Sequence, residues 1–239
     1  MKKAVIFDKD GTLLDFEAFW LPVARGALTE LAHRSGVPLG AVRAVEEKLG
    51  ITAGRAEKNG VLCAGTYAEM AAIVQDVFAA YGIKIGAQEM YRKVCRAFGD
   101  HMYRGEVVPT TPRLKAILDE LKGRGCKLFV VTTDNREMTI ACLKALKIEQ
   151  LFDAVCTDGE GYPAKPDPYV IGKLAEEYSL ERASLAMVGD TLTDLHFARR
   201  GGITGIGYAK DESGKKLLSP FADRGVGDLC ELPRLLEQI

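Results

Sequence analysis

The sequence predicts an α/β fold, in which a parallel β-sheet forms the core and a helical segment is inserted after the first strand. Short apolar runs rich in branched residues are typical of buried strands and occur at residues 4–7, 127–131, 154–156, 185–188 and 203–206. From about residue 112 onward, segments with a helical pattern separate these runs, as in a parallel sheet covered on both faces. The segment between the first two runs has helical patterns instead of strands.

The composition is that of a globular protein with no preference for polyanions. The chain has 239 residues, of which 47% are apolar and 27% charged, and its formal net charge is -1. No excess of positive charge is available to hold a nucleic-acid backbone or an anionic membrane surface. No apolar stretch suits a signal peptide or approaches the roughly 18 residues of a membrane span. We therefore expect no nucleic-acid or membrane partner. We also expect a cytoplasmic protein that is a monomer or weak homodimer.

The six cysteines show no C-x-x-C spacing, so neither a redox pair nor a local zinc site is expected. We interpret them as buried, reduced thiols.

The inserted segment is expected to form a domain of its own. Helices fit residues 16–35, 38–49 and 86–104, and Thr66 with Glu69 forms a possible capping box before a further helix. We expect a core of residues 1–15 and 106–239 and a helical domain of residues 16–105.

The core resumes with a helix after the insertion. Thr111 and Pro112 suit its N-cap and first position, and Gly125 suits its end. The chain crossings near 14–17 and 105–111 would form a hinge.

Two carboxylates follow the first strand directly. In extended chain, Asp8 and Asp10 project to the same side, so both could face one ligand. Their repulsion is offset by a hard divalent cation such as Mg²⁺. Gly11 would let the backbone turn and present N–H groups to an anion, while the Thr12 hydroxyl could tie the loop down. The alternative is an acidic turn or helix cap.

Threonines end the second strand, where open α/β sheets bind ligands. Thr132 could hydrogen-bond a phosphate oxygen, or it could cap the helix that follows. Lys165, between prolines in Ala164-Lys165-Pro166-Asp167-Pro168, suits phosphate binding better than a solvated surface position.

Carboxylates also follow the strand at residues 185–188. Asp190 is a natural third metal ligand. Asp194 could bind a metal-bound water or orient Lys165, or it could only cap a helix or be exposed.

The motifs DKDGTLLD, a strand ending in threonine, KPDP and GDTLTD occur in this order. They resemble the four motifs of the haloacid dehalogenase superfamily of phosphatases, and the resemblance spans nearly the whole chain. It implies a Rossmann-like core with an inserted helical cap domain, as in the branch of phosphoglycolate phosphatases and β-phosphoglucomutases.

The resemblance also implies roles for individual residues. Asp8 would attack phosphorus and form an aspartyl-phosphate, and Asp10 would protonate the leaving group and then activate water. Mg²⁺ would lie between Asp8, the Asp10 backbone carbonyl and Asp190. Phosphate binding would fall to Thr132, Lys165, Gly11 and Thr12, with Asp194 and Thr133 in support.

This chain departs from the family pattern in two places. Thr133 stands where relatives often have asparagine, which leaves open which threonine is the ligand. Arg113 follows Pro112 where many relatives have glycine, which concerns the hinge.

In this branch the cap selects the substrate, so specificity should lie in the inserted domain. The glycine-rich segment 50–60 would be a loop facing the active site or an exposed connection. In the first case, Arg55 or Lys58 could meet a substrate carboxylate or a second phosphate.

The leading hypothesis is a Mg²⁺-dependent phosphatase acting on a small phosphorylated metabolite, most like phosphoglycolate phosphatase. The alternative within the same fold is a β-phosphoglucomutase-type phosphotransferase, which returns the phosphoryl group to a sugar. A receiver-like phospho-signalling module combines similar residues, but receivers lack Asp-x-Asp-Gly-Thr and need no such insertion.

Overall fold

Two segments far apart in the sequence, Met1–Asp15 and Val107–Ile239, form one unit of the structure, and Phe16–Glu106 forms the other. The computed structural model describes residues 3–58, 60–158 and 160–238. The two chain crossings of the first unit run side by side, because the Asp15 N–H donates to the Val108 carbonyl at 2.8 Å.

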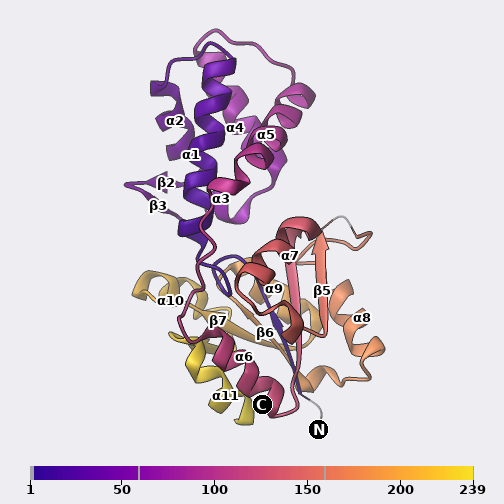
Figure 1. Cartoon of the computed structure of the whole chain (residues 1–239). Coiled ribbons are helices and arrows are strands. Elements are labelled where there is room, and N and C mark those ends of the chain that lie inside the picture. The colour runs from indigo at the N-terminus through magenta and orange to yellow at the C-terminus, as the bar shows by residue number, and fades with distance from the viewer. Residues whose placement is uncertain (1–2, 59, 159, 239) are drawn as a thin grey trace. The chain divides into compact units, whose positions relative to one another are not determined.

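The first unit is built on a six-stranded parallel sheet (Figure 1). Its strands are β1 (Ala4–Phe7), β4 (Lys127–Asn135), β5 (Ala154–Asp158), β6 (Leu185–Gly189), β7 (Thr204–Tyr208) and β8 (Arg224–Val226), in the order β5-β4-β1-β6-β7-β8. This confirms the predicted α/β fold. The sixth strand, β8, was not predicted, because three residues with one buried side chain give no apolar run.

The strand β1 lies between β4 and β6 in the sheet. The strands β4 and β5 follow on one side of β1, and the later strands β6, β7 and β8 follow on the other side, so the strand order reverses at β1. In sheets of this order, ligands bind in the crevice at the carboxyl ends of the strands beside the reversal. The segments that follow β1, β4 and β6 therefore stand at the position expected of a binding site.

Both faces of the sheet are covered, which explains the continuous apolar strands. Val5 and Phe7 of β1 pack in one cluster with α6 (Leu114–Gly123) and α11 (Leu232–Leu235). The alternate residues, Ala4 and Ile6, pack in the other cluster with α8 (Tyr169–Glu177) and α9 (Leu192–Gly201). The remaining helices of this unit are α7 (Arg136–Ala145), α10 (Glu212–Leu218), η2 (Glu149–Leu151), η3 (Arg182–Ser184), η4 (Leu229–Glu231) and η5 (Leu236–Gln238).

Helix α6 begins later than the sequence predicts. Its N-cap is Arg113 and its first residue is Leu114, so the assignment of Thr111 and Pro112 to these positions was wrong. The preceding Thr110 donates its N–H to the Leu13 carbonyl at 3.1 Å, which keeps the chain against the loop after β1. The Leu114 N–H then donates to the Thr111 carbonyl at 3.1 Å, so a turn precedes the helix.

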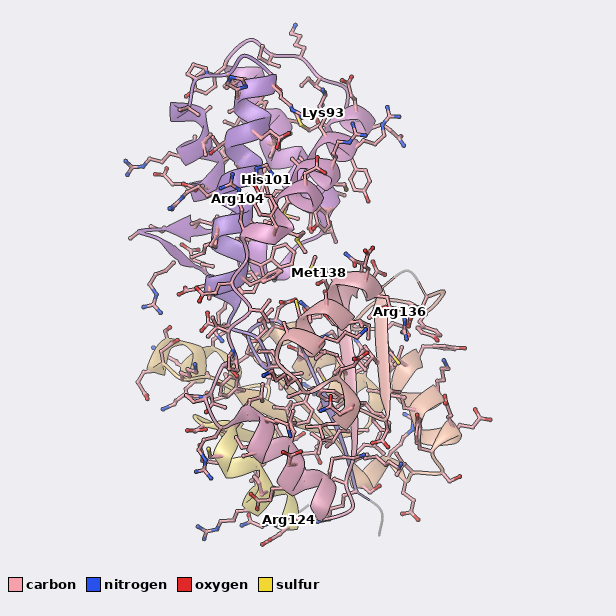
Figure 2. The ribbon with its side chains drawn as sticks, in the orientation of Figure 1. Lys93, His101, Arg104, Arg124, Arg136 and Met138 are labelled. Atoms are coloured by element: carbon pink, nitrogen blue, oxygen red, sulfur yellow. The ribbon has the colours of Figure 1, made fainter. Side chains whose placement is uncertain are left out.

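The predicted end of α6 is confirmed. Gly125, with φ of 81°, follows the last turn. Arg124, labelled in Figure 2, donates to the Pro233 carbonyl at 3.0 Å and pairs with Glu120 and Glu237, which ties the end of the chain to α6.

The second unit is mainly helical. Its helices are α1 (Phe16–Arg34), α2 (Gly40–Lys48), α3 (Val61–Ala64), α4 (Tyr67–Ala80), α5 (Ala87–His101) and η1 (Met102–Arg104). The capping box is confirmed: the Thr66 N–H donates to Glu69 Oε2 at 2.7 Å and the Glu69 N–H donates to Thr66 Oγ1 at 3.2 Å.

The segment expected to be a loop contains a two-stranded antiparallel ribbon instead. Its strands are β2 (Ile51–Thr52) and β3 (Arg55–Ala56). Ala53 and Gly54 between them have φ of 52° and 76°, the positive values of a tight hairpin turn. The sequence did not predict this turn, because Ala53 stands before Gly54 where asparagine or aspartate is the usual signal.

In the described part of the chain, no helix has the length and apolar character needed to cross a membrane. All six cysteines are free thiols, as expected, but only Cys126, Cys142 and Cys156 are buried, so burial was overestimated for the other three.

Alkaline pH is expected to destabilise the first unit through its buried thiols. Burial raises the pKa of Cys156 from 9.0 to about 11. Between these values the unfolded chain loses the thiol proton and the folded chain keeps it, so the free energy of unfolding falls as pH rises. Cys156 therefore contributes roughly 2 to 3 kcal/mol to the fall. Urea unfolding of Cys156→Ala from pH 8 to pH 11 should show a smaller fall than the wild type, and equal slopes would contradict this.

Candidate active site

The loop after β1 is a tight turn with a fixed backbone. The Asp8 N–H extends the sheet by donating to the Val188 carbonyl of β6 at 2.9 Å. The Lys9 carbonyl accepts the N–H groups of Leu13 and Leu14, both at 2.9 Å. This closure fixes where the acidic side chains of the loop can lie.

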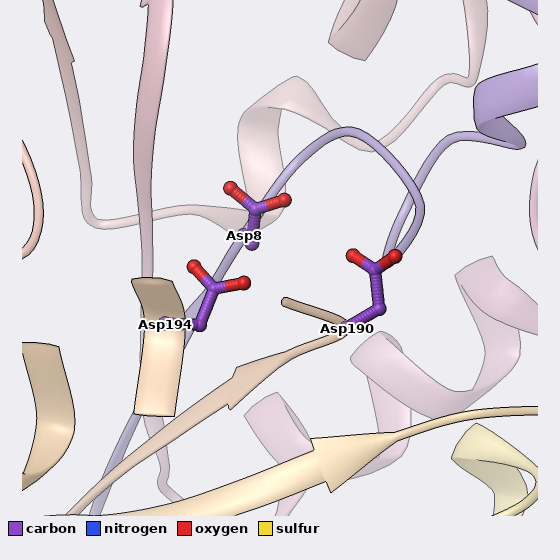
Figure 3. Close-up of side chains that lie close together, drawn as sticks. All are labelled: Asp8, Asp190 and Asp194. Atoms are coloured by element: carbon purple, nitrogen blue, oxygen red, sulfur yellow. The ribbon is translucent and has the colours of Figure 1, made fainter. Parts of the chain in front are cut away.

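Three carboxylates meet at the carboxyl ends of β1 and β6. Asp8, Asp190 and Asp194 each offer an oxygen within 4.8 Å of the others (Figure 3), and all three residues are buried. Burial raises the pKa of Asp8 well above its ordinary value; Lys165 opposes this, while the other carboxylates add to it. Such an all-oxygen cluster suits a hard divalent cation.

Asp194 is the member of this cluster least available to a metal ion. Its Oδ1 accepts from Lys165 Nζ at 2.6 Å, and its Oδ2 accepts from the Thr191 hydroxyl at 2.6 Å and the Thr191 N–H at 3.1 Å. Asp194 therefore both caps α9 and contacts Lys165, and the alternative of an exposed position was wrong.

Lys165 bridges two of the carboxylates. Its Nζ lies 2.6 Å from Asp8 Oδ1 and 2.6 Å from Asp194 Oδ1, and its side chain is only 4% exposed. Burial alone would lower the pKa of this ammonium group, but Asp194 and Asp8 raise it above its ordinary value. Lys165 is therefore a fixed cation at the centre of the site.

Of the two threonines that end the second predicted strand, Thr132 is buried and Thr133 is exposed. Thr132 lines a small cavity together with Lys165, and its Oγ1 accepts the Asp134 N–H at 3.2 Å. Asn135 is the N-cap of α7, so the alternative that Thr132 caps this helix was wrong.

The Thr12 hydroxyl is fully buried and donates to Asp190 Oδ1 at 3.1 Å. It thus fixes a carboxylate, as well as helping to hold the loop. The Gly11 N–H donates to the Leu14 carbonyl at 2.7 Å, so this N–H closes the turn rather than facing an anion. Phosphate binding by either residue remains a prediction.

Gly11, with φ of 82°, allows the loop to approach Asp190 closely. A Cβ at this position would lie 2.2 Å from Asp190 Oδ2. The loop can therefore approach the carboxylate this closely only with glycine.

Gly11→Ala is expected to displace Asp190 and to raise the Mg²⁺ concentration for half-maximal activity by roughly 10- to 100-fold. Gly82→Ala is the matched control, because Gly82 has φ of 83° and nothing within 4 Å of its added Cβ. Both variants bear backbone strain of about 1 to 3 kcal/mol. A Mg²⁺ titration of activity should separate them, and equal midpoints would contradict the role of Gly11.

Lys9 was missed by the sequence analysis. Its side chain has no exposed area, and its Nζ lies 2.7 Å from Asp10 Oδ1 and 3.0 Å from Asp134 Oδ2. The signal was present, because a lysine directly after a buried strand needs a partner if it points inward. The chain bends at Lys9, and the Asp10 carboxylate pairs with this lysine. That Asp8 and Asp10 face one ligand remains a prediction.

With Lys9, the site holds more negative than positive charge. Two lysines face five carboxylates, those of Asp8, Asp10, Asp134, Asp190 and Asp194. A divalent cation would offset part of this excess, so the residues present fit Mg²⁺.

Arg55 and Lys58 both belong to the second unit. The Arg55 side chain is 74% exposed, and its Nε lies 3.7 Å from Glu17 Oε1. Their role in substrate selection remains a prediction.

Comparisons with known proteins agree on one family. The family model of haloacid dehalogenase-like hydrolases matches residues 2–202. The phosphoglycolate phosphatase of Neisseria gonorrhoeae is 27% identical over an alignment of 240 residues, which covers 96% of this chain and 91% of the relative. Pyrophosphatase PpaX of Bacillus mycoides is 27% identical over 158 residues, 65% of this chain and 74% of the relative.

Solved structures show the same fold. A haloacid dehalogenase-like family hydrolase from Streptococcus pneumoniae superposes with a TM-score of 0.68 at 19% identity, covering 98% of both chains. A subfamily IA hydrolase from Geobacter sulfurreducens gives a TM-score of 0.64 at 21% identity, covering 98% of this chain and 96% of the other. With a family match over most of its length, the chain belongs to the haloacid dehalogenase-like hydrolases.

Proposed function

We propose that this protein is a Mg²⁺-dependent phosphatase that hydrolyses a small phosphorylated metabolite through an aspartyl-phosphate on Asp8. The observation that carries the proposal is the buried Asp8 carboxylate, which lies 2.6 Å from Lys165 and within reach of Asp190 at the carboxyl ends of β1 and β6. A nucleophile beside a fixed cation and a metal site is the arrangement that phosphoryl transfer requires.

In the first step, an Asp8 oxygen attacks phosphorus and the bond from phosphorus to the leaving oxygen breaks. Asp10 gives its proton to that oxygen. In the second step, Asp10 takes a proton from water, the water oxygen attacks phosphorus, and the bond from Asp8 to phosphorus breaks. Inorganic phosphate leaves, and both carboxyl groups return to their starting states.

Charge on the transferred group has to be neutralised throughout. Lys165 and the buried Thr132 hydroxyl would hold its oxygens from one side. Asp8, the Asp10 carbonyl and Asp190 would hold Mg²⁺, which supplies Lewis-acid stabilisation of the phosphoryl oxygens when bound.

We further propose that residues 1–15 and 106–239 form the catalytic core and that residues 16–105 are a cap that selects the substrate. A relative named phosphoglycolate phosphatase covers nearly all of both chains, whereas relatives named pyrophosphatase cover 53% to 85% of this chain. Phosphoglycolate is therefore the first substrate to test. Arg55 and Lys58 are candidates for contact with its carboxylate.

The test is a Mg²⁺-dependent phosphate-release assay on 2-phosphoglycolate, pyrophosphate and sugar phosphates. The proposal predicts release from at least one of them, with 2-phosphoglycolate preferred, and loss of release in excess chelator. Isomerisation of a sugar phosphate without phosphate release would favour a phosphomutase instead. A long-lived phosphoprotein without turnover would favour a signalling role.

A further inference from the structure

A buried chain of charges connects β4 to the proposed acid–base residue. Asp134, near the end of β4, lies 3.0 Å from the Lys9 ammonium, which in turn donates to Asp10 Oδ1 at 2.7 Å. Lys9 has no exposed side-chain area, and the side chain of Asp134 is only 8% exposed. A buried ammonium carries a desolvation cost of several kcal/mol, whereas an apolar side chain would fill the same space without it. The charge of Lys9 therefore calls for an explanation beyond packing.

Lys9 and Asp134 are each held by further contacts. The Lys9 carbonyl accepts two N–H groups of its own loop, which fixes the backbone from which the ammonium extends. Asp134 Oδ1 accepts the Asn135 N–H at 2.8 Å, and the Asp134 N–H donates to Thr132 Oγ1 at 3.2 Å. Asp134 is thus held by the segment that carries the proposed phosphate-binding threonine. The lysine between these anchors has little freedom to move.

Asp10 depends on this arrangement for its orientation. Among the described residues, its carboxylate has one hydrogen bond, from Lys9 to Oδ1, and the side chain is 17% exposed. Holding Oδ1 restricts the rotation of the carboxylate and leaves Oδ2 as the oxygen that can carry the proton. General acid catalysis needs such placement, because proton transfer requires hydrogen-bond distance to the leaving oxygen.

We propose that Lys9 and Asp134 are positioning residues, which hold the Asp10 carboxylate so that it can protonate the leaving oxygen. The inference rests on the proposed function. It adds two residues to which the sequence analysis gave no role. Asp134 acts on Asp10 only through Lys9. If the pair had a purely structural role, its loss would lower the stability of the protein and would lower kcat/KM by the same factor for every substrate.

The test compares two aryl phosphates that differ in leaving group. Phenol is a poor leaving group, with a pKa of about 10 like that of tyrosine, and needs the proton more than 4-nitrophenol does. The quantity measured is kcat/KM for phenyl phosphate divided by kcat/KM for 4-nitrophenyl phosphate, with Mg²⁺. This ratio reports the step in which the leaving group departs, whichever later step limits kcat.

Asp134→Asn is expected to lower this ratio roughly tenfold, because Lys9 loses the Asp134 carboxylate as an anchor while Asp10 keeps its partner. Lys9→Met should lower it by about 100-fold or more. Asp134→Asn is the primary variant, since Lys9→Met leaves two carboxylates without their cation and is more prone to unfold.

Asp153→Asn is the matched control. Asp153 also lies between two lysines, Lys122 and Lys127, both at 2.7 Å, and its side chain is 13% exposed. It precedes β5, at the opposite end of the sheet from the site. This variant should lose stability and keep the wild-type ratio.

An unchanged ratio in Asp134→Asn, or equal losses on both esters, would overturn the positioning role while leaving the proposed function in place. If the wild type released phosphate neither from these esters nor from 2-phosphoglycolate, pyrophosphate or sugar phosphates, the proposed function would fail and the positioning role would fail with it.

Discussion

Replacing Asp8 with asparagine is expected to lower phosphate release from 4-nitrophenyl phosphate by at least roughly 10⁴-fold, because the amide cannot form the acyl phosphate on which both steps depend. The side chain keeps its size and lies at a fixed point of the sheet, so the fold should persist. The measurement is kcat with saturating Mg²⁺, with the exposed Asp119→Asn as a control that retains wild-type activity.

The same substitution should not destabilise the protein in the absence of metal. Because burial and the neighbouring carboxylates raise the pKa of Asp8 in the folded state, its ionised form is disfavoured there. The wild type therefore loses stability as pH rises above the unfolded value of 3.8, and asparagine removes that loss. Urea unfolding at pH 7 should give the variant a free energy of unfolding no lower than that of the wild type. Turnover within tenfold of the wild type would contradict the nucleophile assignment.

Lys165→Met is expected to impair both activity and stability. The variant leaves Asp8 and Asp194 buried without the ammonium that lies 2.6 Å from each. Removing one partner of such a buried pair costs about 3 to 5 kcal/mol. Loss of a cation beside the transferred phosphoryl group should lower kcat by roughly 10² to 10³-fold.

Urea unfolding with and without Mg²⁺ measures the stability effect. Mg²⁺ should restore part of the loss, because it binds the folded state and offsets the same negative charge. Lys115→Met is the control: Lys115 pairs with Asp119 at 2.7 Å on the exposed face of α6, and such pairs contribute at most about 0.5 kcal/mol. A loss below about 1 kcal/mol in Lys165→Met would contradict the role of Lys165 as the central cation.

The acids at the strand ends could be predicted because two local rules coincide. Apolar runs identified β1 and β6, and the carboxyl ends of parallel strands lie at the same edge of a sheet, so the strand pattern alone placed Asp8 and Asp190 at that edge. Their proximity also depends on the pairing of β1 with β6, which the strand pattern does not give.

The contacts of Lys9 and Asp194 could not be predicted in the same way. The alternation rule assumes extended chain, but the backbone bends at Lys9, and this brings its ammonium to Asp10 and to Asp134 of a distant segment. In the sequence, Asp194 suits a helix cap as well as a contact with Lys165. The structure shows that it makes both. Such pairings depend on tertiary distances between residues far apart in sequence.

Chemical trapping of the intermediate tests the central claim most directly. Borohydride reduces an acyl phosphate to an alcohol, so protein quenched during turnover of 4-nitrophenyl phosphate and then reduced should carry homoserine in place of Asp8. Mass spectrometry of the peptide that contains residues 4–15 would detect the change. We predict homoserine at Asp8 only when substrate and Mg²⁺ are both present; reduction at another carboxylate, or none during active turnover, would contradict the covalent mechanism.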